Sequence, residues 1–349
     1  MNGREIREGV AISETSRAMK TKIVAGTLLL IVWVLLTFLV LTRMPQLAGQ
    51  RVGASGVASP PKIKVVVTIP ILKDLVVQTC GQYVNVTSLI TDDIEVLGFQ
   101  QTPRDVVTVY QANLLIKIGA GLDDWVDRIT RDLDRPNLEV IDLSRSVGLL
   151  DKSGRHIGGV PAALAGRADP YFWLDPGNVR QMILAIHLGI IGIMPEAAKY
   201  LEQERQAYFA ELDKLESDMA TELAHASGVK MVAGCDGLFY FAKRFNLSVV
   251  GRLEQMVPRI AEPHATGRLA ETLLANKVRI IVLDTLSEQL FAQQLAKLGP
   301  FKIALLSSAV GGDRRSEGYL ALMRSNARSL AAAVEALGSR ESQRPAGDL

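Results

Sequence analysis

The chain is poor in the residues from which stapled and metal-clustered scaffolds are built. Its 349 residues contain two cysteines, Cys80 and Cys235, and four histidines. Two cysteines so far apart exclude a disulfide scaffold, and the scattered histidines form no metal motif of regular spacing. Its 39 basic residues nearly balance 37 acidic ones, for a net charge of +2. This balance argues against the strongly basic surface that nucleic-acid binding uses.

The N-terminal segment contains one long apolar run, Ile23–Leu41, without a charged residue. Its length is about that of a helix that spans a bilayer. Five basic residues precede the run and two follow it closely, which predicts a cytoplasmic tail over 1–22 and an extracytoplasmic location for the rest. A cleaved signal peptide is the alternative. Because the apolar core of a signal peptide is usually shorter, a single uncleaved membrane anchor is predicted.

The segment 42–61 is expected to be a linker, because it is rich in Gly, Ser, Ala and Pro and has no periodicity. It includes QLAGQ (46–50), which resembles a bacterial lipoprotein cleavage box with Gln50 at the place of the lipidated cysteine. Without a thiol no lipid can be attached there, and the apolar helix would serve as the tether. A chance match is an equally good explanation of these five residues.

From Lys62 onward, short apolar runs alternate with helical patterns, which is typical of α/β folds with mostly parallel sheets. The pattern occurs twice and is interrupted by one long amphipathic run. We therefore predict two α/β lobes, each with a mostly parallel sheet flanked by helices, bridged by one long helix. The predicted parts are the N-terminal lobe 62–194, the linking helix 195–227, the C-terminal lobe 228–338 and a disordered tail 339–349.

Ligands of open α/β sheets bind beyond the carboxyl ends of the strands. This rule selects four places in the sequence. They are the loop 91–102, the stretch ADPYFWLDP (168–176), Cys235 with Asp236 after one predicted strand, and Asp284 at the end of another. Two lobes that face each other across such loops would form a cleft, which is a common location for small ligands.

The successive blocks of the chain resemble the zinc/manganese solute-binding proteins of bacterial ABC importers. The resemblance covers about Lys62 to Val334. It rests on the order and spacing of VVVTIPILKDLVVQ, TSLI, QTPRDV, ANLLIKIGAGLDDWVDRI, DPYFWLDPGNV, CDGLFYFAKRFNL, AEPHATGRLAETL and EGYLALMRSNARSLAAAV.

The resemblance implies a periplasmic or cell-surface receptor that holds a divalent transition metal, zinc or manganese, as transported ligand. It further implies delivery to an ABC permease in the membrane, a monomeric receptor and no catalysed reaction. Family members usually supply three histidines and one carboxylate to the metal. Here those positions are occupied by Leu97, Tyr171, Cys235 and Asp284, so only the carboxylate is retained.

The donor chemistry of this set is weaker than that of the family. Leu97 cannot ligate a metal, and Tyr171 is a neutral phenol with an ordinary pKa of about 10. Cys235 as thiolate and Asp284 are competent ligands. His264 in AEPHATG lies at a place that the family puts near the cleft, and it could complete a set of Cys235, Asp284 and His264 with Tyr171 nearby.

Each candidate also has a structural explanation. Cys235 fits a small apolar residue at a strand end, Asp284 fits a helix cap, and His264 fits an exposed first-turn position. The two aspartates of ADPYFWLDP, Asp169 and Asp175, are expected to fix their loop and cap the next helix. Packing roles are expected for the remaining apolar or aromatic candidates, Cys80, Trp125, Trp173 and His187.

Three functions are consistent with these observations. The first is a membrane-anchored metal receptor of an ABC importer with an atypical or weakened site. The second is a divergent member that no longer binds metal and serves as a receptor for another ligand or as an accessory protein. The third, an enzyme with Cys235 as nucleophile, is disfavoured because no histidine has an evident pairing with this cysteine.

Overall fold

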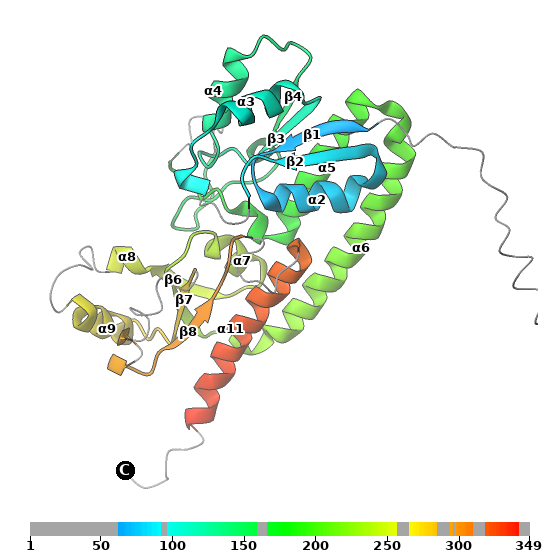
Figure 1. Cartoon of the computed structure of the whole chain (residues 1–349). Coiled ribbons are helices and arrows are strands. Elements are labelled where there is room, and N and C mark those ends of the chain that lie inside the picture. Colours follow the sequence, from blue (N-terminus) through cyan, green and yellow to red (C-terminus); the bar gives the residue numbers. More distant parts are fainter. Residues whose placement is uncertain are drawn as a thin grey trace, which may run out of the picture. The chain divides into compact units, whose positions relative to one another are not determined.

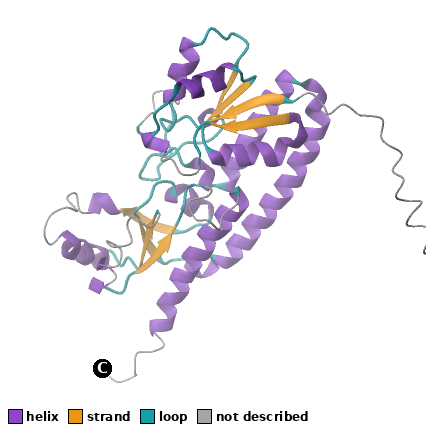
Figure 2. Cartoon of the chain, in the orientation of Figure 1, coloured by secondary structure: helices purple, strands orange, loops and turns teal. Residues whose placement is uncertain are grey.

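The structure is a computed structural model that describes residues 62–91, 96–158, 166–256, 265–284, 294–295, 297–309 and 318–341. The predicted membrane span Ile23–Leu41, the linker up to residue 61 and residues 342–349 lie outside these ranges. Within the ranges, no helix has the length and apolar character needed to cross a bilayer. The described part forms two α/β lobes, whose strands and helices are separated by colour in Figure 2.

The first lobe contains a parallel sheet with the strand order β2-β1-β3-β4. Its strands are β1 (Ile63–Val67), β2 (Val84–Ser88), β3 (Leu114–Lys117) and β4 (Glu139–Asp142). The central strands β1 and β3 are apolar throughout most of their length and buried, as expected of parallel strands covered on both faces. Its helices are α2 (Pro70–Cys80), α3 (Pro103–Tyr110), α4 (Trp125–Asp132) and α5 (Pro176–Ile193).

Three of these helices start where the sequence places a proline in the first turn, a position at which the missing N–H costs nothing. α3 is also stabilised by a capping box, in which Thr102 and Asp105 satisfy each other's backbone amides. Asp175 caps α5, because its carboxylate accepts a hydrogen bond of 2.7 Å from the amide of Gly177. The cap predicted for Asp175 is confirmed.

The second lobe repeats the plan with a parallel sheet in the order β6-β5-β7-β8. Its strands are β5 (Lys230–Ala233), β6 (Ser248–Arg252), β7 (Ile280–Leu283) and β8 (Lys302–Leu305). The helices assigned here are α7 (Leu238–Arg244), α8 (Leu253–Met256), α9 (Ala265–Ala275) and α11 (Tyr319–Glu341). α11 ends at Glu341, three residues beyond the predicted end of the C-terminal lobe at 338.

The long amphipathic run forms α6 (Ala198–Glu222), flanked by short 3-10 turns at Pro195–Ala197 and Ala224–Ala226. The 25 residues of α6 correspond to roughly 37 Å of helix. α6 packs against α2 and α5 of the first lobe and against α11, which Figure 1 shows running beside it. Its buried face consists of Leu201, Tyr208, Leu212, Leu215 and Met219.

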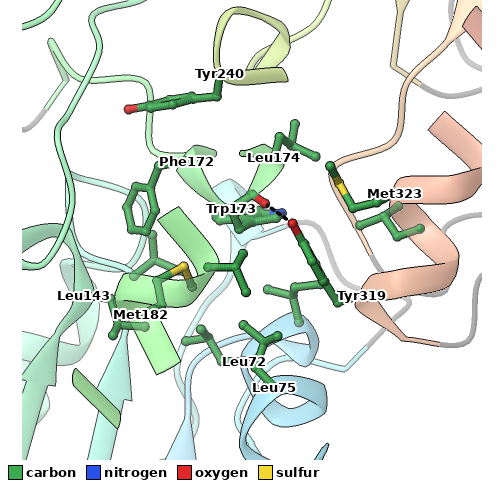
Figure 3. Packing of buried hydrophobic residues seen from close by; sticks show 14 of the residues in the cluster. Leu72, Leu75, Leu143, Phe172, Trp173, Leu174, Met182, Tyr240, Tyr319 and Met323 are labelled. Atoms are coloured by element: carbon green, nitrogen blue, oxygen red, sulfur yellow. Dashed lines mark hydrogen bonds between the residues drawn. The ribbon is translucent and has the colours of Figure 1, made fainter. Parts of the chain in front are cut away.

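One apolar core extends from the first sheet into the second. The same buried cluster includes Val65 of β1 and Met231 of β5. Figure 3 shows Trp173 and Tyr319 where this core passes between the lobes. The hydroxyl of Tyr319 donates a hydrogen bond of 3.0 Å to the carbonyl of Trp173, and the backbone amide of Tyr319 donates to Asp74 of α2. α11 therefore begins in contact with the first lobe.

Candidate functional site

Four polar side chains gather at the carboxyl edge of the second sheet, and we refer to Cys235, Asp236, Arg252 and Asp284 as the strand-end cluster. Ala233 of β5 is paired with Arg252 of β6 on one side and with Val282 of β7 on the other. Two residues further along, Cys235 follows β5 and Asp284 follows β7. The strand register alone thus places the predicted ligands Cys235 and Asp284 next to each other.

Cys235 is buried, with 4% of its surface exposed. Burial raises the pKa of its thiol well above the ordinary value. The negative charges of Asp284, Asp236 and Asp169 raise it further, whereas Arg252 lowers it. The thiol is therefore protonated at neutral pH, and a metal that binds Cys235 has to displace this proton.

Arg252 is the cation of the strand-end cluster. It is buried, with 7% of its surface exposed, and its Nη2 lies 2.7 Å from Oδ1 of Asp236. Its Nε donates to Glu254, which is half exposed. Despite its burial, these partners raise the pKa of Arg252, so the guanidinium is charged. Arg252 was not among the predicted site residues, although a basic residue at the carboxyl end of a predicted strand was the available signal.

The stretch ADPYFWLDP lies against the strand ends of the second lobe. Asp169 is fully buried and accepts hydrogen bonds from the amide of Tyr171 at 3.1 Å and from the amide of Gly237 at 2.8 Å. Burial raises the pKa of the Asp169 carboxyl to about 6. Asp169 therefore fixes its own loop, as predicted, and in addition joins that loop to the turn after Cys235.

Two further hydrogen bonds hold the same stretch. The indole Nε1 of Trp173 donates to the carbonyl of Ser308, which follows β8, at 2.9 Å. The hydroxyl of Tyr240 in α7 donates to the carbonyl of Asp169 at 3.0 Å. Trp173 is almost fully buried, so the predicted packing role is confirmed, and its N–H provides an additional connection between the lobes.

Tyr171 is half-buried, and its ring centroid lies 5.2 Å from that of Trp173. Tyr171 packs closely against Gly237. If residue 237 had a side chain, its Cβ would lie only 2.8 Å from the Cβ of Tyr171. Gly237 also has a φ of +78°, which a residue with a side chain adopts only with strain. Tyr171 is thus held close to the turn that follows Cys235.

The remaining predicted ligands are placed only in part. Asp284 is half-buried and acts electrostatically on Cys235. His264 lies outside the described residues. Leu97 falls in the 3-10 turn Val96–Gly98, and its side chain lies outside the described part as well. In the part of the chain that the structure describes, no three His, Cys, Asp or Glu side chains converge to hold a metal ion. The described donors alone therefore do not fit a complete metal site.

The described histidines have other surroundings than Cys235. His156 contacts the amino group of Lys243. His187 is buried in α5, as its predicted packing role requires, and burial lowers its pKa to about 4. His225 belongs to the 3-10 turn Ala224–Ala226. No hydrogen bond joins any of these three histidines to the thiol, so the arrangement expected of an activated cysteine nucleophile is not found among them.

A separate cavity of about 410 Å³ lies at the carboxyl edge of the first sheet. It is lined by Lys117, Asp127, Arg131, Asp142 and Arg145, among others. Lys117 is buried and binds both carboxylate oxygens of Asp127, at 2.6 and 2.7 Å. The cations and carboxylates of this cavity are therefore largely matched to each other, and none belongs to the strand-end cluster.

Residues 65–333 match the family model described as zinc-uptake complex component A, periplasmic. This match covers most of the chain, and the chain belongs to this family of extracytoplasmic solute-binding proteins of metal uptake systems. The resemblance stated from the sequence blocks is confirmed.

Relatives share low identity over most of their length. The iron-binding protein YfeA of Yersinia pestis is 23% identical over 239 residues, covering 68% of this chain and 74% of that protein. The manganese ABC transporter substrate-binding lipoprotein PsaA of Streptococcus pneumoniae is 23% identical over 240 residues, covering 67% of this chain and 75% of that protein. Iron and manganese are the metals named for these two relatives, and neither name assigns a metal to this chain.

The fold is shared with solved structures of the family. The metal-dependent lipoprotein YcdH of Bacillus subtilis superposes with a TM-score of 0.66 at 19% identity, covering 78% of this chain and 99% of that one. The predicted fold class is thereby confirmed for the two parallel sheets and their helices.

Proposed function

We propose that this chain is the extracytoplasmic solute-binding component of an ABC-type metal importer and that it binds its cargo in a cleft between the two lobes at an atypical, weakened site. Family membership supports the transport class and argues against catalysis. The observation that carries the site is the register of β5 and β7, which brings Cys235 beside Asp284 at the edge where α/β sheets bind ligands.

The proposed donors are Cys235 and Asp284, with Tyr171 held nearby and His264 as a further candidate. A thiolate and a carboxylate suit zinc and softer transition metals. Zinc or manganese is the expected cargo, and the name of one relative extends the range to iron. The site is weakened because the Cys235 thiol first has to lose a proton, which its burial and then its acidic surroundings oppose.

The chain would be tethered to the membrane by the apolar run Ile23–Leu41 and would act as a monomer that delivers metal to a permease. Residues 1–22 would then be cytoplasmic and 42–61 a linker. The two lobes, 62–194 and 228–338, would enclose the cargo and be joined by the segment 195–227. In this arrangement a protein helix would serve as the tether, whereas several relatives are named lipoproteins.

Thermal unfolding of the detergent-purified full-length protein tests the proposal. Zn²⁺, Mn²⁺, Fe²⁺ and Cu⁺ are added in turn, and each melting temperature is compared with that in EDTA. A ligand that binds only the folded state stabilises it by RT ln(1 + [L]/Kd). We expect stabilisation by at least one of these ions, and a smaller shift for Cys235→Ala and Asp284→Ala. The exposed Asp124→Ala serves as the control and should keep the full shift.

A second candidate is a family member that no longer binds metal and instead serves as a receptor for another ligand or as an accessory protein. It is favoured by the buried guanidinium of Arg252 beside the proposed donors and by the direct hydrogen bonds between the lobes. The absence of a shift with all four ions would select this candidate over the first.

A further inference from the structure

Arg252 is an unusual residue to find at a cation site. It is more than nine-tenths buried, its side chain ends at the carboxylates of Asp236 and Glu254, and its charge acts on Cys235. A buried charge is costly unless it is paired. The pairing here is incomplete within the described part of the chain, since the buried Nη1 of Arg252 has no hydrogen-bond acceptor there. The hydrogen bonds of the guanidinium are therefore incomplete, and they do not by themselves explain its burial at this place.

The strand register gives the approximate distance between the Cα atoms of Arg252 and Cys235. Arg252 is the partner of Ala233, and Cys235 follows two residues later. With neighbouring strands about 4.8 Å apart and a rise of about 3.3 Å per residue, their Cα atoms are roughly 8 Å apart. The charge of Arg252 also reaches Asp169 and Cys235, since it lowers the pKa of both groups.

Three acidic residues around Cys235 would otherwise make this edge strongly negative. They are Asp236, Asp284 and the buried Asp169. Arg252 neutralises part of this charge and engages Asp236 directly. A bound metal ion would do the same for these carboxylates, so the guanidinium and the ion compete for one electrostatic role.

We infer that Arg252 is a built-in counter-cation of the strand-end cluster that competes with the metal ion and sets both the affinity and the charge selectivity of the site. This inference rests on the proposed function. At an effective dielectric constant of about 20, a fixed unit charge about 10 Å from a divalent ion weakens binding by roughly two orders of magnitude. The effect on a monovalent ion is smaller, because the repulsion scales with the charge of the ion.

The test measures dissociation constants of the full-length protein for Zn²⁺ and Ag⁺ by competition with metal-binding dyes. Arg252→Gln removes the charge and keeps much of the side-chain length, and we expect it to tighten Zn²⁺ binding by at least about tenfold and Ag⁺ binding by clearly less. Arg252→Lys keeps the charge and should stay within about threefold of the wild type. Arg131→Gln, an exposed arginine on α4, makes the same change in net charge away from the site and should leave both constants unchanged.

A second variant keeps the inference testable if Arg252→Gln does not fold by circular dichroism. Asp236→Asn retains the guanidinium and removes its partner, so we expect weaker Zn²⁺ binding and a smaller change for Ag⁺. Equal changes for the two ions, or a folded Arg252→Gln that binds Zn²⁺ no more tightly than the wild type, would overturn the inference. If the wild type binds no metal ion but Arg252→Gln does, the proposed function is refuted and the inference about Arg252 stands.

Discussion

The backbone amide of Gly237 donates a hydrogen bond of 2.8 Å to Oδ2 of Asp169, across 68 positions of sequence. Gly237 belongs to the turn after β5 that begins with Cys235, and Asp169 belongs to the stretch that presents Tyr171. The other oxygen of the same carboxylate accepts from the amide of Tyr171. One buried side chain thus fixes the two segments that carry Tyr171 and Cys235.

Replacement of Asp169 by alanine is expected to destabilise the protein by about 3 kcal/mol. The substitution leaves the amides of Tyr171 and Gly237 buried without an acceptor, and each such loss costs about 1–3 kcal/mol. Urea denaturation at pH 7.5 measures the difference in the free energy of unfolding. Asp218, which is exposed within α6, gives the control, since Asp218→Ala should change stability by less than about 0.5 kcal/mol. Equal effects of the two substitutions would contradict the role assigned to Asp169.

Tyr319→Phe tests the connection between α11 and the first lobe. The substitution removes a fully buried hydroxyl and leaves the carbonyl of Trp173 without this donor (Figure 3). We expect a loss of about 1–2 kcal/mol in the free energy of unfolding, from urea denaturation at constant pH. Tyr110 is half exposed, so Tyr110→Phe should be nearly neutral. A neutral Tyr319→Phe would show that the hydrogen bond in Figure 3 adds nothing to stability.

Asp123 makes the stability of the protein depend on pH. The carboxyl is fully buried at the end of β3, and burial raises its pKa to about 6 even though Thr68, Ile118 and Gly119 donate hydrogen bonds to it. Because the folded pKa exceeds the unfolded value of about 3.9, its contribution to stability is complete below pH 4. That contribution is lost as the pH rises through 6.

Urea denaturation of wild type and Asp123→Asn between pH 4.5 and 7.5 measures this contribution. From pH 7.5 to pH 4.5, the free energy of unfolding of the wild type should rise by about 2 kcal/mol relative to that of the variant. Comparison with the variant is necessary because His187 also titrates in this range. Its pKa is lowered to about 4, so it makes the free energy of unfolding of both proteins fall as the pH decreases. A difference that is independent of pH would show that Asp123 does not titrate in this range.

The alternation of strands and helices follows from local signals and was predicted correctly. Runs such as IKVVV and the residues IIVL of β7 are apolar because both faces of a parallel sheet are covered. The prolines at the helix starts and the cap at Asp175 are equally local. Each of these features depends on residues that lie within a few positions of one another.

The candidate site was predictable only where strand ends determine it. Cys235 and Asp284 follow adjacent strands, so the rule for α/β sheets was sufficient to bring them together. The bond from Gly237 to Asp169 and the ion pair of Arg252 with Asp236 depend on how separate segments pack. No periodicity or motif in the sequence records such a packing contact, so the place of Arg252 at a strand end did not reveal its ion pair with Asp236.

Both cysteines are expected to be unreactive in the folded protein. Burial raises the pKa of the Cys80 thiol to about 12 and that of Cys235 well above its ordinary value. Since only the thiolate attacks a disulfide reagent, reaction with DTNB at pH 8 should be at least about a hundredfold slower than in guanidinium chloride, where two thiols per chain should react. Cys80→Ser and Cys235→Ser assign any fast phase to one residue. A rapid phase in the folded protein that disappears in Cys235→Ser would mean that Cys235 is an activated thiolate, which would contradict the protonated thiol described here and favour a nucleophilic enzyme over a receptor.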